Sequence, residues 1–226
     1  MNLLQKGIQA MKEQKLDEAA KYLTEAIDKH PEEPLAYINF GNLLLKMNEF
    51  DRAERFFEKA VKLDETAATA YYGLGSVFYE KGMFSKAQGF FETAHQKGLQ
   101  SGDVFFMIGM CLYRQEQPKL ALPYLQRAAE LEPEDVDARF QYGLALAQIG
   151  QVDLAHDVFK KVLELKEDHS DAHYNLGVVC LYHDDPQKAL AHFERALEIQ
   201  PDHILAGHGK GKVEEMLKEE DKKDNR

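Results

Sequence analysis

The sequence predicts an all-α protein built from helix-turn-helix units that repeat every 34 residues. Three ladders of small residues with this period support the prediction. The first is a glycine ladder: Gly7, Gly41, Gly75, Gly109, Gly143, Gly177 and Gly211. The other two consist of alanines and one valine: Ala19, Ala53, Ala87, Ala121, Ala155 and Ala189, then Ala26, Ala60, Ala94, Ala128, Val162 and Ala196. Such a fixed period is typical of repeat proteins, in which each unit packs against the next.

The glycine ladder marks the first helix of each unit. Around Gly41, the large apolar residues Phe40, Leu43 and Leu44 recur at helical spacing. A glycine inside a helix costs about 1 kcal/mol relative to alanine, so a glycine in every first helix requires a packing reason. We expect the glycines to face the alanine ladders and to let the two helices of a unit approach closely.

The turn and the start of the second helix have signals of their own. Gly82 and Gly150 lie where a first helix should stop, at a position that glycine commonly occupies. Pro118 and Pro186 fit the first position of a second helix, where a missing N–H group costs no hydrogen bond. Each unit is therefore expected to be two helices of about thirteen residues joined by a short turn.

The second helices carry two further local features. Asp51 with Glu54, and Ser85 with Gln88, have the spacing of N-terminal capping boxes. Pro123 falls inside a second helix, where it removes a backbone hydrogen bond and should kink the helix.

The end of the chain contains "GHGKGK", residues 207–212, which invites comparison with a phosphate-binding loop. Such a loop requires an earlier glycine and a following Ser or Thr, but the chain has Ala206 and Val213 at these positions. Gly211 is instead the seventh rung of the glycine ladder. We therefore expect a C-terminal capping helix over residues 204–220, frayed at its start, and a charged solvent-facing tail over 221–226.

Composition restricts the class of protein. The formal net charge is -11, which disfavours binding to nucleic acid because a phosphate backbone requires a basic surface. No segment resembles a signal peptide or is apolar over the length of a membrane span. The two cysteines, Cys111 and Cys180, lie far apart in helical patterns, unlike a disulfide framework. We expect a cytoplasmic protein that binds neither nucleic acid nor membrane.

Two segments, "AYINFGNLLLKMNEFDRAERFFEKAVKLD" (36–64) and "AHYNLGVVCLYHDDPQKALAHFERALEIQPD" (172–202), show the repeat most fully. The pattern resembles the tetratricopeptide repeat (TPR), and more loosely the small stand-alone TPR proteins of bacteria. The resemblance implies a right-handed α-solenoid whose first helices line a concave groove. It divides the chain into six repeats, at about residues 1–33, 34–67, 68–101, 102–135, 136–169 and 170–203.

The resemblance also implies which side chains face the groove. Apolar and aromatic residues are densest at Phe106, Met110 and Tyr113, at spacings of four and three, which suits the burial of apolar anchors of a partner. The alternative is that neighbouring repeats cover these side chains. The other aromatic residues expected in the groove are Tyr72, Tyr79, Phe140 and Tyr174.

Polar groove positions form a second set. Asp103, Asp137 and Asp171 follow the 34-residue period and could pair with Lys or Arg of a ligand; alternatively, each only offsets the dipole of its own helix. Arg114 also faces the groove in this register. Three asparagines are expected to hold a peptide backbone: Asn39, Asn42 and Asn175.

Signals for catalysis are weak. Neither cysteine has a histidine at motif spacing, and Ser76 in "GLGSV" does not stand in a nucleophile motif. His169 and His173 are four residues apart, but no third ligand lies at local spacing, so surface or packing roles are favoured over zinc. We expect no enzyme, cofactor or metal.

The sequence thus predicts an adaptor that binds a peptide segment of a partner protein, with apolar and basic residues, in the concave groove. A second hypothesis is a structural module in which open solenoid ends stack into homo-oligomers. A third is that the chain is the repeat portion of a longer protein.

Overall fold

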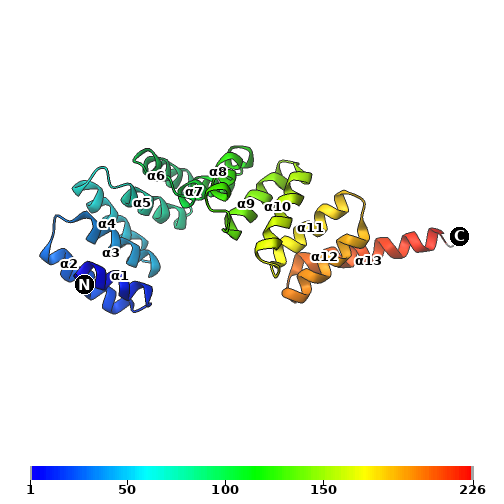
Figure 1. Cartoon of the computed structure of the whole chain (residues 1–226), viewed down its shortest axis with the longest axis horizontal. Coiled ribbons are helices and arrows are strands. Elements are labelled where there is room, and N and C mark those ends of the chain that lie inside the picture. Colours follow the sequence, from blue (N-terminus) through cyan, green and yellow to red (C-terminus); the bar gives the residue numbers. More distant parts are fainter. Residues whose placement is uncertain (1, 225–226) are drawn as a thin grey trace. The chain divides into compact units, whose positions relative to one another are not determined.

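The computed structural model describes residues 2–224, and the regular structure in this range is helical (Figure 1). The helices are α1 (Leu3–Lys12), α2 (Leu16–Lys29), α3 (Pro34–Lys46), α4 (Phe50–Leu63), α5 (Ala68–Glu80), α6 (Phe84–Gln96), α7 (Gly102–Arg114), α8 (Pro118–Leu131), α9 (Val136–Gln148), α10 (Val152–Leu165), α11 (Ser170–Tyr182), α12 (Pro186–Ile199) and α13 (Ile204–Asp224). The predicted all-α repeat architecture is confirmed.

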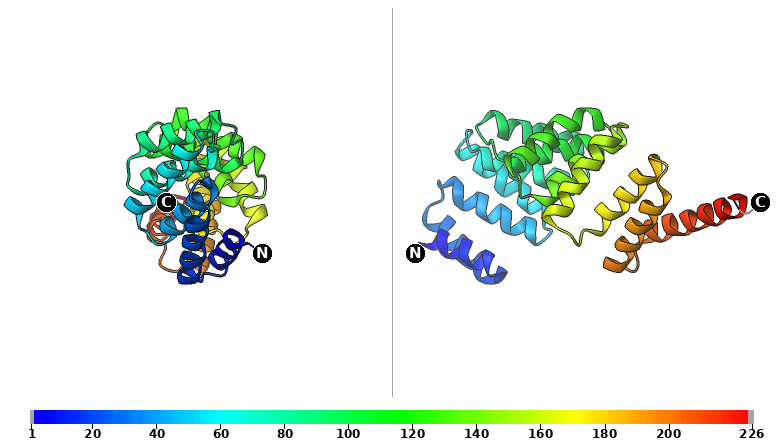
Figure 2. Two further views of the ribbon diagram at one scale, coloured as in Figure 1. Left: turned by 90° about the vertical axis from the view of Figure 1, so that its left-hand side faces the viewer. Right: turned by 45° about the vertical axis from the view of Figure 1, so that its right-hand side comes forward.

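The chain divides into two compact units, Met1–Gln117 with α1 to α7 and Pro118–Arg226 with α8 to α13. Within each unit, consecutive helices pack against each other as antiparallel neighbours (Figure 2). First helices of successive repeats also touch: α1 contacts α3, α3 contacts α5, and α11 contacts α13. First helices therefore line up along one side of their unit, which is the arrangement a shared binding face requires.

The glycine ladder permits close helix packing as predicted, but the partner is different. A Cβ atom added to Gly177 would lie 2.5 Å from the Phe193 ring, and one added to Gly143 would lie 2.7 Å from the Phe159 ring. Gly41 and Gly75 meet phenylalanine rings in the same way. The expectation that alanines face the glycines is wrong, because an aromatic ring from the second helix fills the space above these four glycines, and the Leu23 side chain does so above Gly7.

The turns follow the predicted geometry. Gly82 and Gly150 have φ angles of 72° and 81°, in the left-handed region that glycine adopts without strain. The equivalent position in the other turns is held by residues that also have positive φ: Gln14, Asn48, Glu116 and Asp184. A left-handed residue after each first helix is therefore a rule of this repeat, met by glycine in two cases and by polar side chains in the rest.

The starts of the second helices differ in part from the prediction. Pro118 and Pro186 open α8 and α12 as expected. The capping boxes are wrong: α4 and α6 begin at Phe50 and Phe84, and neither has a side-chain cap. A cap at residue 51 or 85 would place the first helical residue at 52 or 86, so the helices start two residues earlier than the capping boxes require. Pro123 lies inside α8, which continues past it to its end.

The last helix, α13, runs without interruption through the three glycines of residues 207–211, where fraying was expected. Its first part packs on α12 and α11, and its second part extends beyond them (Figure 1). Gly209, rather than the ladder residue Gly211, lies against Phe193. The helix reaches Asp224, past the predicted limit of 220, while residues 225–226 of the predicted tail lie outside the described residues.

Candidate functional site

The predicted groove residues all fall on first helices. In the first unit they are Asn39 and Asn42 on α3, Tyr72 and Tyr79 on α5, and Asp103, Phe106, Met110, Tyr113 and Arg114 on α7. In the second unit they are Asp137 and Phe140 on α9, and Asp171, Tyr174 and Asn175 on α11. Their contacts and exposure decide which of them remain accessible to a ligand.

The apolar cluster of α7 is accessible in part. Phe106, Met110 and Tyr113 are each half-buried, so packing holds one side of each side chain and leaves the other side open. Burial raises the pKa of Tyr113, which keeps its phenol neutral. Asp103 and Arg114, at the two ends of the helix, are exposed. The face thus offers an apolar surface between a carboxylate and a guanidinium.

An aromatic contact joins α5, α6 and α7 near the ends of the two first helices. The rings of Tyr79 and Phe84 lie edge to face with centroids 5.3 Å apart, and the Arg114 guanidinium lies 5.1 Å from the Phe84 ring centre. Burial raises the pKa of Tyr79, and the Arg114 charge partly opposes the shift. Two predicted groove residues therefore meet through Phe84, which sequence reasoning missed because it opens a second helix.

Three other aromatic residues contribute mainly to packing. Tyr72 packs against Phe91, with ring centroids 5.1 Å apart. Tyr174 packs against Phe193 at 5.8 Å. Phe140 is only 9% exposed, because the Phe159 ring and the neighbouring repeat cover it, so it offers little surface to a ligand.

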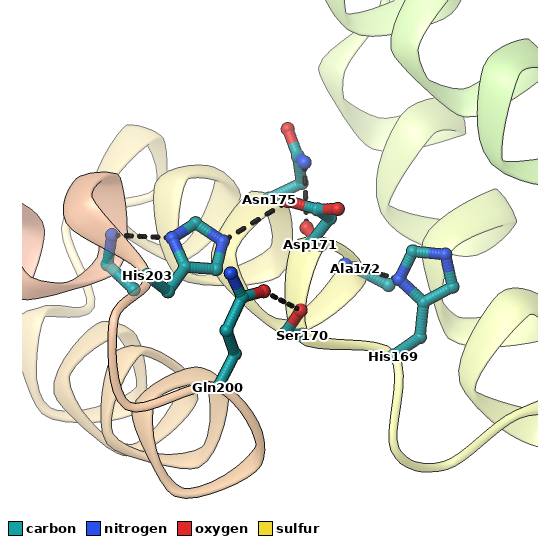
Figure 3. A network of polar contacts seen from close by, with 8 residues as sticks. His169, Ser170, Asp171, Ala172, Asn175, Gln200 and His203 are labelled. Carbon is teal, nitrogen blue, oxygen red and sulfur yellow. Dashed lines mark hydrogen bonds and ion pairs between the residues drawn. The ribbon is translucent and has the colours of Figure 1, made fainter.

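The three aspartates of the acidic ladder are exposed, but they are not equivalent. Among the described residues, neither Asp103 nor Asp137 has a hydrogen bond or an ion pair through its side chain. Asp171 accepts a hydrogen bond from Nε2 of His203, at 3.2 Å (Figure 3). Asp103 and Asp137 are thus available to a cationic ligand, while Asp171 is already bound to the imidazole of His203.

The asparagines that were expected to hold a peptide backbone lie in two environments. The amide groups of Asn39 and Asn175 donate to backbone carbonyls of their own helices, Leu35 at 2.7 Å and Asp171 at 2.8 Å. Each side-chain oxygen therefore remains an acceptor for a ligand N–H group. Asn42 is exposed on α3.

The residues considered for metal or thiol chemistry have structural roles. His169 precedes α11, and its Nδ1 accepts a hydrogen bond from the backbone N–H of Ala172, while His173 is buried. Within the part of the chain that the structure describes, no three His, Cys, Asp or Glu side chains come together as metal ligands would. Burial raises the pKa of the Cys111 thiol to about 12, which suppresses the reactive thiolate.

A cavity of about 650 Å³ that the sequence did not indicate lies where α1, α2 and α3 meet. Leu3, Leu4 and Leu35 form its apolar part, with Lys6 and His30 among its polar residues. None of the predicted groove residues lines it. Among residues 2–224, no helix is both long and apolar enough to cross a membrane.

A chain of helix pairs with a 34-residue period and open first-helix faces belongs to the class of α-helical repeat proteins. Family models described as tetratricopeptide repeat match residues 10–64, residues 38–97 and 106–168, and residues 170–203. The chain therefore belongs to the TPR family. No curated protein matches it.

Solved structures with the same fold include proteins of similar length. YrrB, described as a TPR protein with an unusual peptide-binding site, is 49% identical, with a TM-score of 0.75 over 84% of this chain and 97% of YrrB. PilF of Pseudomonas aeruginosa is 15% identical, with a TM-score of 0.84 over 93% and 96% of the two chains. MamA of Desulfovibrio magneticus RS-1 is 22% identical, with a TM-score of 0.69 over 76% and 97%. The last two likenesses show the fold alone.

Proposed function

We propose that the protein is a non-enzymatic cytoplasmic adaptor that binds a peptide segment of a partner protein on the face of its first helices. The observation that carries the proposal is the α7 face, on which Phe106, Met110 and Tyr113 are half-buried between exposed Asp103 and Arg114. The similarity to YrrB, which has a peptide-binding site, supports it. The six predicted repeats and the capping helix from residue 204 serve as the scaffold.

The α7 face suits an apolar anchor for an energetic reason. Side chains that packing already holds lose little rotamer entropy when a ligand covers them, so most of the gain from burial is retained. Removing apolar surface from water contributes about 25 cal/mol per Å². An aromatic or aliphatic side chain of the partner seated between Phe106 and Met110 would therefore dominate the affinity, as central apolar anchors commonly do.

The acidic ladder defines the second part of the ligand. Asp103 on α7 and Asp137 on α9 are exposed and carry no side-chain partner among the described residues. Asp103, which shares α7 with the apolar cluster, can pair with Lys or Arg of the partner, which orients the segment and speeds association more than it raises affinity. We therefore propose a ligand that combines an apolar anchor with a basic residue.

The test is a selection from a random peptide library displayed on phage, followed by calorimetry. The selected peptides should be enriched in aromatic or aliphatic residues and in Lys or Arg. Phe106→Ala with Met110→Ala should weaken their binding about 10- to 100-fold. Leu120→Ala, which changes an exposed residue of the second helix α8, is the matched control and should leave affinity unchanged.

Peptides that bind the doubly substituted protein as tightly as the unchanged protein, with helical circular dichroism preserved in both, would refute the α7 anchor. A selection that yields no peptide above background would count against the peptide-binding function itself.

A second candidate function is end-to-end assembly of copies through the last helix. Ile204 and Leu205 at the start of α13 are 85% and 58% exposed, which is unusual for large apolar side chains. Burial of these residues between copies would drive association. A molecular mass that stays monomeric in light scattering as concentration rises would exclude this function.

A further inference from the structure

The residues that precede α9, α11 and α13 occupy the same position of the repeat, and each caps the N-terminus of its helix. The Asp135 carboxylate accepts the backbone N–H of Ala138 at 3.0 Å. Nδ1 of His169 accepts the backbone N–H of Ala172 at 3.2 Å, and Nδ1 of His203 accepts that of Ala206 at the same distance. Each side chain thus satisfies one of the unpaired N–H groups at the start of its helix.

Histidine can cap a helix only in one protonation state. Nδ1 must carry a lone pair to accept an N–H group, so the imidazole must be neutral with its proton on Nε2. In His203, Nε2 is then the donor to Asp171, at 3.2 Å (Figure 3). Both nitrogens of His203 are therefore used by the neutral ring, and a second proton on Nδ1 would point a donor at the donor of Ala206.

We propose that His169 and His203 are pH-sensitive helix caps in the second unit. Protonation of these imidazoles removes the N-terminal caps of α11 and α13. A carboxylate at the same position, as in Asp135, can accept the hydrogen bond in either charge state. Substituting histidine for an acidic cap makes the starts of two helices depend on pH. The inference concerns the folded chain by itself and does not require the proposed peptide ligand.

The two caps are coupled, because contacts link the start of α11 to the turn before α13. Asp171 is bound to His203, and the Ser170 hydroxyl donates to the Gln200 side chain at 3.0 Å (Figure 3). The ring of Tyr174 lies 5.3 Å from the ring of His203. Loosening either cap therefore acts on residues Asp171 and Tyr174 of the first-helix face.

The groups around His169 place its protonation at acid pH. Burial against Phe140 of α9 lowers its pKa, and Lys166, in the preceding turn, lowers it further. The carboxylates of Asp171 and Asp137 act in the opposite direction. For His203, the facing charged group is Asp171 of α11, whose carboxylate oxygen lies 3.2 Å from Nε2. Protonation of His203 thus removes the cap and at the same time offsets the negative charge of Asp171.

A second pair of histidines connects α11 to α12, and this contact also requires that at least one imidazole is neutral. Nδ1 of His173 lies 3.2 Å from Nδ1 of His192, and Nε2 of His173 is 3.1 Å from the carbonyl oxygen of Glu167. One Nδ1 must donate and the other accept, so the pair cannot be doubly protonated in this geometry. Arg195 near His173 and His156 near His192 add repulsion to the charged forms.

The experiment follows single amide protons by nuclear magnetic resonance between about pH 8 and about pH 5.5, the range in which histidine commonly titrates. The amides of Ala172 and Ala206 should lose exchange protection, corrected for intrinsic rates, by about fivefold as pH falls. The amide of Ala138, capped by Asp135, is the internal control and should keep its protection.

His169→Asn and His203→Asn are the decisive variants, because asparagine is among the best N-caps and does not titrate. In the double variant the protection of Ala172 and Ala206 should become independent of pH. His208→Asn, at an exposed position of α13, should behave as the unchanged protein. Protection that is flat in the unchanged protein, or that falls equally in the double variant, would overturn the proposal, whether or not a peptide binds.

Discussion

At the scale of single residues, the neighbours of the ladder glycines differ from one repeat to another. The buried ring of Phe193 lies so close to Gly177 that a Cβ atom there would be 2.5 Å from a ring carbon. Gly211 has the same place in the repeat. A Cβ atom added to it would meet no atom within 4 Å, because no later second helix packs on it. Two residues equivalent in sequence thus differ in packing.

This contrast yields a stability prediction. Gly177→Ala should destabilise the second unit by about 1–3 kcal/mol, because overpacking must displace a fully enclosed ring. Gly211→Ala, as the matched control, should stabilise by up to about 1 kcal/mol, since alanine is the better helix former. Thermal unfolding followed by circular dichroism measures both. Equal effects of the two substitutions would contradict the packing explanation.

The left-handed turn residues give a second prediction at this scale. Gly150 has a φ of 81°, where an L-residue with a Cβ atom is strained, so Gly150→Ala should cost about 1 kcal/mol. Glu116 adopts a φ of 60° without the freedom of glycine, so Glu116→Gly should be neutral or stabilising. The denaturant midpoint should fall for Gly150→Ala and should stay the same or rise for Glu116→Gly; a loss of stability in both would show that the turn conformation is not the controlling factor.

At the scale of elements, the pair of helices α11 and α12 depends on protonation through the buried histidines at or next to it. Burial lowers the pKa of His169, His173 and His192 below the value of about 6.5 for free histidine. The unfolded chain therefore binds more protons than the folded chain at mildly acid pH. Their contribution to stability is complete above about pH 6.5 and is lost as pH falls through the lower folded-state values.

The resulting prediction is that the unfolding temperature of the second unit falls between about pH 7 and about pH 5.5. His192→Gln removes one titrating group and should reduce the slope by up to about 1.4 kcal/mol per pH unit. Calorimetric scans at a series of pH values provide the measurement. A slope unchanged by the substitution would show that His192 binds its proton equally in both states.

At the scale of the whole molecule, charge is the dominant property. The formal net charge of -11 attracts cationic segments from a distance, and the exposed aspartates of the first helices are the proposed local contacts. Screening by salt weakens both effects, since the Debye length shrinks to about 8 Å at physiological ionic strength.

Binding of a basic peptide obtained by selection should therefore weaken as salt rises. Asp103→Asn, on the helix that carries the proposed anchor, should lower affinity severalfold at low salt and reduce the salt dependence. Glu164→Gln removes the same charge from the exposed side of a second helix, α10, and should change affinity much less. Association rates measured by stopped flow would reveal the effect; identical salt dependence in the two variants would show that the aspartate ladder does not touch the ligand.

The repeat period, the family and the helix pairs were predictable because they depend on the spacing of residues along the chain. Glycine at positions 82 and 150 correctly predicted the turns, since the backbone conformation of a turn depends on the residues within it. The shared helix face of Phe106, Met110 and Tyr113 was also predictable, because their spacing of four and three places them on one side of a helix whatever packs beside it. Their role as an anchor stays a proposal.

Contacts between helices were decided only by the tertiary structure. The sequence by itself could not show that phenylalanine rings face four of the ladder glycines, that Phe140 is covered, or that Phe84 joins Tyr79 to Arg114. It presented His169 and His203 as two histidines among nine, whereas the fold makes them caps and binds one of them to Asp171. Periodicity determines which residues share a helix face, but the role of a side chain depends on the atoms that meet it, and these come from another helix.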